Sequence, residues 1–199
     1  MNKTVIIDYG AGNIRSVANM LSYLDVPYEI TSERDKILKA ERIIFPGQGH
    51  FAQAMENLEQ KNLDTVIKTV CKKGIPFLGI CIGLQILFES SEEAPGKNGL
   101  GIFKGYVKRF KNKKVPQIGW SKIQTQSSKY LQDEYYYFVN SYYVVPDDNS
   151  IISAIGDYQE KYCAAVEQGN ITAVQFHPEK SANAGLAFFE NWLGKYGIN

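Results

Sequence analysis

The chain has 199 residues, of which 44% are hydrophobic and 22% charged, as in a globular protein with one sizeable core. Its formal net charge of +1 provides no overall field that would attract nucleic acid or a membrane surface. The start of the chain reaches Asp8 too early for a signal peptide, and no apolar run approaches about 20 residues. We therefore expect a cytoplasmic protein with neither nucleic acid nor a membrane among its partners.

The first half of the chain alternates short apolar runs with segments of helical periodicity. Val5–Ile7 predicts a buried strand, and the turn that follows leads into a helix for which Asn13 is the expected N-cap. Further strands are expected at residues 27–30, 43–45 and 77–80, and further helices at residues 51–58 and 63–73. This alternation predicts a parallel sheet with helices on both faces.

The second half is richer in aromatic and β-branched residues and predicts an antiparallel extension of the same sheet. Strand-like runs lie at residues 135–145, 151–155, 162–166 and 171–176, and a closing helix is expected at residues 184–196. We find no long linker or repeat, so residues 1–199 are predicted to form a single domain. The expected fold class is α/β, with an open, mostly parallel, flavodoxin-like sheet.

Cys81 lies in the sequence Gly79-Ile80-Cys81-Ile82-Gly83, between an apolar run and a helix-like run at residues 84–88. A strand that turns sharply into a helix lifts one side chain clear of the sheet, and flanking glycines let the backbones crowd together. We interpret Cys81 as a thiol nucleophile on such an elbow, where a helix beginning at Ile82 would favour the thiolate. Cys71 and Cys163 are expected to be buried core residues, because their spacing suggests neither a disulfide nor a zinc site.

The chain has only two histidines, His50 and His177, so Cys–His chemistry must use one of them. His177 follows an apolar run and precedes Pro178, so the strand is expected to run to His177 and then break. In an extended chain Glu179 would point the same way and could fix the tautomer of the imidazole. His50 is the rival base, but it lacks a carboxylate at a useful spacing. These residues predict a Cys81–His177–Glu179 triad.

A nucleophile of this kind also needs N–H donors for an oxyanion. The backbone N–H of Ile82 is one candidate, and the glycine-rich Pro46-Gly47-Gln48-Gly49 can supply a second, although that loop also reads as an ordinary tight turn. The turn Gly10-Ala11-Gly12 is not a dinucleotide-binding motif, because Arg15 stands where such a motif needs its third glycine. The two histidines are too far apart in sequence to suggest a metal site. We expect no cofactor.

Together these motifs resemble the class I (triad) glutamine amidotransferases over nearly the whole chain. The matching blocks are residues 8–13, 46–49, 79–85, 115–120, 138–142 and 175–181. The cysteine and histidine motifs identify the superfamily. The first block and Gly119-Trp120 narrow the resemblance to the glutaminase subunits of imidazole glycerol phosphate synthases, which serve histidine biosynthesis.

The resemblance implies that L-glutamine is hydrolysed to glutamate through a Cys81 thioester. The ammonia would pass to a partner cyclase with a (βα)8 barrel, as part of a heterodimer. The resemblance implies that the oxyanion and the glutamine are held by a group of seven residues, with Glu93 on the α-amino group: Gln48, Gly49, Ile82, Gln85, Glu93, Ser141 and Tyr142. The residues implied to face the partner are Asn13, Trp120, Tyr137 and Lys180.

Two positions depart from the family pattern. The family usually has histidine where Asn140 stands and commonly an aliphatic residue where Gln48 stands. Asn140 supports His177 as the catalytic histidine. Both changes leave open a glutaminase that feeds another synthase, such as an enzyme that amidates surface sugars. A stand-alone cysteine amidohydrolase is a third reading.

Overall fold

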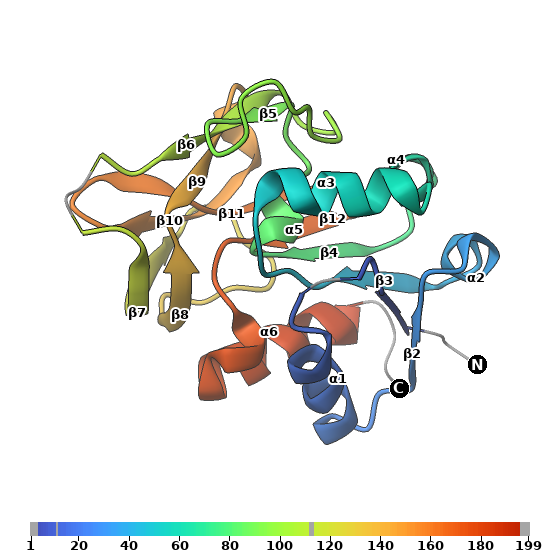
Figure 1. Ribbon diagram of the computed structural model, residues 1–199. Coiled ribbons are helices and arrows are strands. Elements are labelled where there is room, and N and C mark those ends of the chain that lie inside the picture. The colour runs from blue at the N-terminus through green and yellow to red at the C-terminus, as the bar shows by residue number, and fades with distance from the viewer. Residues whose placement is uncertain (1–3, 11, 112–113, 196–199) are drawn as a thin grey trace.

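The computed structural model describes residues 4–10, 12–111 and 114–195, and its centre is a parallel sheet (Figure 1). The strands follow the order β2 (Tyr28–Thr31), β1 (Thr4–Ile7), β3 (Arg42–Phe45), β4 (Phe77–Ile80) and β12 (Ile171–Val174). All neighbouring pairs in this group are parallel. The sheet therefore delivers the residues after β4 and after β12 to the same edge.

Helices cover both faces of the sheet (Figure 1). One layer holds α2 (Arg34–Leu38), α3 (Phe51–Gln60), α4 (Leu63–Lys72) and the short α5 (Ile82–Gln85), and the other holds α1 (Ile14–Tyr23) and α6 (Ala182–Lys195). Successive side chains of β1 point to opposite faces of the sheet, so Val5 and Ile7 belong to one core cluster and Ile6 belongs to the other. Within the described part of the chain, none of the helices is long and apolar enough to cross a membrane.

An antiparallel extension continues the sheet from β12. Its strands run in the order β11 (Lys161–Gln168), β10 (Ile152–Asp157), β7 (Gln117–Thr125) and β8 (Tyr135–Asn140). A side branch of β9 (Tyr142–Pro146), β6 (Gly105–Arg109) and β5 (Ser90–Ser91) attaches through β11, and a single 3-10 turn, η1 (Asn149–Ile151), precedes β10. The α/β fold class with a mostly parallel sheet and helices on both faces is confirmed.

Three local expectations were wrong in their details, and a fourth is not tested. The run at residues 135–145 is two strands broken at Ser141, and the run at residues 171–176 is a strand only as far as Val174. The run at residues 84–88 is helical only as far as Gln85 and then continues into turns, with all of its apolar side chains buried in one core cluster. Residue 196, expected at the end of the closing helix, lies outside the described residues.

Asn13 occupies the N-cap position of α1, as expected, but its side chain does not cap the backbone. The Asn13 Oδ1 accepts a hydrogen bond from the hydroxyl of Ser16 at 2.7 Å. Its amide nitrogen is directed to Glu179, on the segment that follows β12. A long-range contact has therefore replaced the expected local cap.

We expect Gly83→Ala to destabilise the protein by about 1–3 kcal/mol, because the new Cβ would lie 2.7 Å from the carbonyl oxygen of Phe45. Denaturant unfolding followed by circular dichroism measures this loss. Gly194→Ala is the matched control, since a Cβ there meets nothing within 4 Å and alanine suits a helix. Equal stability of Gly83→Ala and the parent chain would contradict the close packing of α5 on β3.

Candidate active site

Cys81 stands at the end of β4 in a backbone conformation that few side chains adopt. Its φ is 53° and its ψ is −103°, and its N–H donates to the carbonyl of Val174 at 2.7 Å. Neither flanking glycine leaves room for a side chain. A Cβ on Gly79 would lie 2.6 Å from the carbonyl oxygen of Gly83, and a Cβ on Gly83 would clash with Phe45. The expected elbow is present, with its thiol on the wall of a cavity.

The helix after the elbow is shorter than expected. α5 spans four residues, Ile82–Gln85, and continues into turns. A single helical turn carries only a small dipole, so the expected stabilisation of a thiolate by a helix N-terminus is weak here.

The loop of residues 46–49 packs directly against the elbow. A Cβ on Gly47 would lie 2.1 Å from Ile82 Cγ2 and 2.7 Å from the carbonyl oxygen of Ile80, so only glycine allows this approach. Gly49 has a φ of 125°, in the region that favours glycine. This loop brings Gln48 and Gly49 to the cavity that also exposes Cys81.

His177 lies beyond β12 and is completely buried. Its Nδ1 and the Oε1 of Glu179 are 2.8 Å apart. Glu179 belongs to a 3-10 turn, η2 (Pro178–Lys180), so the expected extended path from His177 to Glu179 is wrong. The pairing itself is present, because the turn brings the carboxylate back to the imidazole.

The charges around His177 favour its protonated form. Burial alone lowers the pKa of His177, but the adjacent Cys81, and after it Glu179, outweigh burial and raise the pKa from 6.5 to about 10. The imidazolium is therefore the stable form at neutral pH, and it is lost as the pH rises through about 10. With Nδ1 held by Glu179, Nε2 is the ring nitrogen left for Cys81, and it makes no hydrogen bond of ordinary geometry among the described residues.

Cys81 and His177 share one cavity of about 320 Å³. Every residue expected to form the oxyanion and substrate site also lines this cavity: Gln48, Gly49, Ile82, Gln85, Glu93, Ser141 and Tyr142. Sequence reasoning assigned no contact there to three further lining residues, Pro116, Val139 and Asn140. The cavity thus joins segments from the β3 loop, the elbow and the β8–β9 break.

Two acidic or amide side chains in the cavity wall have defined partners. The Oε2 of Glu93 accepts from the N–H of Phe51 at 2.7 Å, which fixes the carboxylate at the start of α3. The Nδ2 of Asn140 donates to the carbonyl of Tyr142 at 2.9 Å, across the break between β8 and β9. The departure at position 140 therefore has a local structural role.

Glu179 is held by a second residue besides His177. The Nδ2 of Asn13 donates to Glu179 Oε1 at 2.9 Å, and the carboxylate side chain is 1% exposed. Asn13 was expected to face a partner, and it is half-buried beside Glu179. Its contact with Glu179 carries no signal in the local sequence, because the two residues are far apart along the chain.

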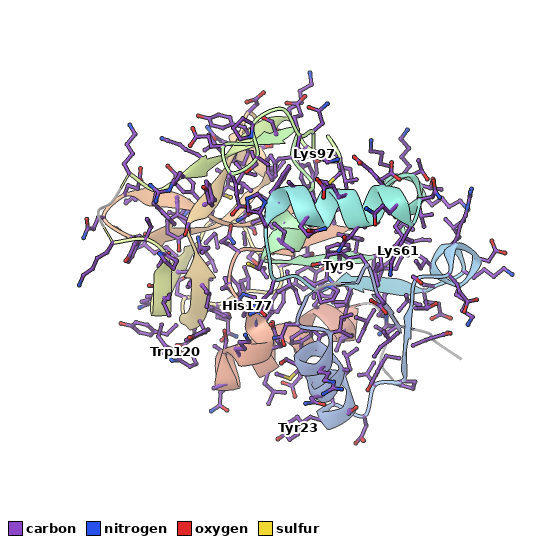
Figure 2. All side chains as sticks on the ribbon, in the orientation of Figure 1. Tyr9, Tyr23, Lys61, Lys97, Trp120 and His177 are labelled. Carbon is purple, nitrogen blue, oxygen red and sulfur yellow. The ribbon has the colours of Figure 1, made fainter. Side chains whose placement is uncertain are left out.

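The other residues expected at a partner interface lie on β7, β8 and η2. Trp120 projects from the sheet edge, away from the buried His177 (Figure 2), and is 52% exposed. Its ring makes an edge contact with Tyr137, at 6.0 Å between centroids. Lys180 is half-buried in η2.

The rival histidine is separate from this constellation. His50 is exposed at the N-cap of α3, where its Nδ1 accepts from the N–H of Ala52 at 3.2 Å. It does not line the cavity. Cys71 and Cys163 are buried free cysteines, as expected, and burial raises the pKa of each to about 12.

Comparisons with known proteins identify a family and close relatives. The family model described as "Glutamine amidotransferase class-I" matches residues 5–195. The chain is 45% identical to "Imidazole glycerol phosphate synthase subunit HisH" of Trichodesmium erythraeum, over 98% of this chain and 95% of the relative. It is 42% identical to the protein of the same name from Aquifex aeolicus, over 97% of each.

Solved structures share the fold at low sequence identity. A crystal structure of a glutamine amidotransferase superposes with a TM-score of 0.79 at 16% identity, over 98% of this chain and 99% of that one. The structure of PurLQS from Thermotoga maritima gives a TM-score of 0.77 at 17% identity, over the same shares. These structures support the fold alone.

We expect both Cys81→Ser and Glu179→Gln to lower the pKa of His177, because each removes a group that raises it. Cys81→Ser should lower it more, since Cys81 has the larger effect. A ¹⁵N NMR titration of the imidazole between pH 6 and 11 measures the change, and with two histidines in the chain the signals can be assigned through a His50→Gln variant. A His177 titration near its ordinary value in the parent chain would contradict the charge arrangement.

Proposed function

Because the chain belongs to the class I glutamine amidotransferases, we propose that it is the glutaminase subunit of an imidazole glycerol phosphate synthase of histidine biosynthesis. It would hydrolyse L-glutamine to glutamate and pass ammonia to a synthase subunit. The observation that carries the proposal is the joint opening of Cys81 and His177 into one cavity, with Glu179 on the far side of the imidazole.

The geometry supports a different role for each residue of the proposed triad. The thiolate of Cys81 attacks the side-chain amide carbon of glutamine, and the imidazolium of His177 donates a proton to the departing ammonia. The neutral imidazole then takes a proton from water, which attacks the thioester and releases glutamate. Glu179 orients the ring throughout, because its Oε1 fixes Nδ1 and leaves Nε2 toward the reaction.

The cavity wall offers complementary groups for glutamine. We propose that Glu93 pairs with the α-amino group, since its carboxylate lines the cavity and is anchored to the start of α3. Gln85, Ser141 and Tyr142 would hold the remaining polar atoms, and the N–H groups of Ile82 and the loop at Gln48 and Gly49 would stabilise the oxyanion. A glutamine side chain is small enough for about 320 Å³.

An exposed apolar strip supports a macromolecular partner. Ile118 and Trp120 lie on one face of β7 and are 64% and 52% exposed. The register places Val139 opposite Ile118 and Tyr137 opposite Trp120, and Tyr135 on the same face of β8 is 55% exposed. Contiguous exposed apolar side chains of this kind are typical of docking surfaces.

The strip is continuous with the proposed active site, because Val139 belongs to both. A subunit seated on the strip would lie beside the cavity, in a position to receive ammonia. We propose that this subunit is a (βα)8-barrel cyclase and that the two chains form a heterodimer. We also propose that the protein is cytoplasmic, where cysteines stay reduced, and the three cysteines of the described residues are free.

We expect Cys81→Ala to lower partner-stimulated glutamine turnover by about 10⁴-fold or more, because the nucleophile is lost. Glutamate release in the assembled enzyme measures this, and Cys71→Ala is the matched control because Cys71 lies in α4, away from the cavity. Retained turnover in Cys81→Ala would refute the proposed mechanism. Full turnover by the isolated parent chain on another amide would favour a stand-alone hydrolase.

We expect Trp120→Ala to weaken binding of the barrel subunit by about 30-fold, since a central exposed tryptophan commonly contributes about 2 kcal/mol to an interface. Isothermal titration calorimetry measures the dissociation constant. Ile30→Ala is the control, because Ile30 is 43% exposed on β2 at the opposite edge of the sheet. Equal weakening by both substitutions would exclude the strip as the specific docking surface.

A further inference from the structure

Two buried glutamine side chains connect the cavity wall to the nucleophile. The Nε2 of Gln85 donates to the carbonyl of Tyr142 at 3.2 Å and to the Oε1 of Gln175 at 3.1 Å. The Nε2 of Gln175 in turn donates to Cys81 Sγ at 3.6 Å. Gln175 is 0% exposed and Gln85 is 5% exposed, so solvent does not compete strongly for these bonds.

The orientation of both amides follows from one backbone group. A carbonyl oxygen can only accept a hydrogen bond, so Gln85 must turn its NH₂ toward Tyr142. The same NH₂ also donates to Gln175, so Gln175 must present its side-chain oxygen as the acceptor. The remaining NH₂ of Gln175 then faces the sulfur of Cys81. The Tyr142 carbonyl thus determines that the nucleophile meets a donor rather than an acceptor.

The position of Gln175 follows from the sheet register. Val174 of β12 is paired with Ile80 of β4, so the next residues, Gln175 and Cys81, leave the sheet side by side. Gln175 N–H also donates to the carbonyl of Ala164 at 2.8 Å, which fixes its backbone against β11. The side chain of Gln175 therefore starts from a backbone that β4 and β11 hold in place next to Cys81.

A donor at this place has a direct chemical consequence. A thiolate accepts hydrogen bonds more strongly than a thiol, and a hydrogen bond to a charged group in a dry site is worth more than one in water. The helix α5 is too short to provide much stabilisation of its own. The side-chain N–H of Gln175 fills that role.

We propose that Gln175 is a catalytic residue of this chain, whose side-chain N–H stabilises Cys81 as a thiolate and aims the sulfur into the cavity. Gln85 and the Tyr142 carbonyl act as positioning groups that keep the donor turned toward sulfur. The proposal rests on the proposed function in one respect, that Cys81 is the nucleophile.

The test is alkylation of the full chain by iodoacetamide across a range of pH, with the Cys81 adduct followed by mass spectrometry. Gln175→Glu keeps the shape but replaces the donor with an acceptor and a negative charge. We expect Cys81 alkylation at pH 7 to slow by about tenfold or more, and the midpoint of the pH profile to move upward. Gln175→Met, which keeps the length without any donor, should slow alkylation in the same direction and by less.

A second variant tests the orientation argument with Gln175 left in place. Gln85→Glu offers only acceptors to Gln175, which then turns its NH₂ toward position 85 and its oxygen toward sulfur. We expect slower alkylation of Cys81 in this variant too. Gln117→Glu is the matched control, because Gln117 is 2% exposed and bonded to Tyr162 and Ser121 rather than to the site.

The outcomes separate this proposal from the proposed function. Alkylation needs neither glutamine nor a partner, so it reports the thiolate alone. Parent-like rates and midpoints in Gln175→Glu and Gln175→Met, with native circular dichroism, would overturn the role of Gln175. Retained partner-stimulated turnover in Cys81→Ala would instead overturn the proposed function. If Gln175→Glu fails to fold, Gln175→Met together with Gln85→Glu decides the matter.

Discussion

The strained backbone at Cys81 is the constraint on which the site depends. A φ of 53° in a residue with a side chain costs on the order of 1–3 kcal/mol and persists only where the surroundings enforce it. Here the enforcement comes from glycine contacts and from the bond between Cys81 N–H and the carbonyl of Val174. That bond joins the strand that leads to Cys81 to the strand that leads to His177, so the elbow and the imidazole are positioned by a single pairing of β4 with β12.

Buried charge is the second constraint, and the site satisfies it by arranging the charged groups in a row. Burying a carboxylate, an imidazolium or a thiolate alone would cost several kcal/mol. In this row Glu179 Oε1 accepts from His177 and Asn13, while His177 lies between Glu179 and Cys81. Each buried charge therefore has an opposite charge or an oriented dipole beside it. The same row makes the imidazolium stable at neutral pH, which is the form needed to protonate a leaving amine.

Local patterns in the sequence predicted most of the fold and the pairing of Cys81, His177 and Glu179, whereas most of the other residues that line the cavity were implied by the family resemblance. Strands and helices are indicated by apolar residues that recur with periods of two and of about 3.6 residues. The elbow and the His177–Glu179 pair are each contained in a short stretch of sequence. What could not be predicted depends on register and on long-range pairing. Gln175 gains its partner only because β12 pairs with β4 at one particular offset. The break at Ser141 has no glycine or proline to mark it, and it follows from the way β8 and β9 attach to different neighbours.

Tyr137 and Asn13 connect the surface proposed for the partner to the proposed triad. Tyr137 places its ring against Trp120 on the apolar strip, while its carbonyl accepts from the N–H of His177 at 2.9 Å and its own N–H donates to Ser181 Oγ. Ser181 Oγ in turn donates to the carbonyl of His177, so the strand that carries the strip also fixes both backbone groups of His177. Asn13 provides a second connection, since it reaches Glu179 from the loop before α1. A subunit that shifts β8 or this loop by a fraction of an ångström would therefore change the geometry of the imidazole directly, without any movement of β4 or β12.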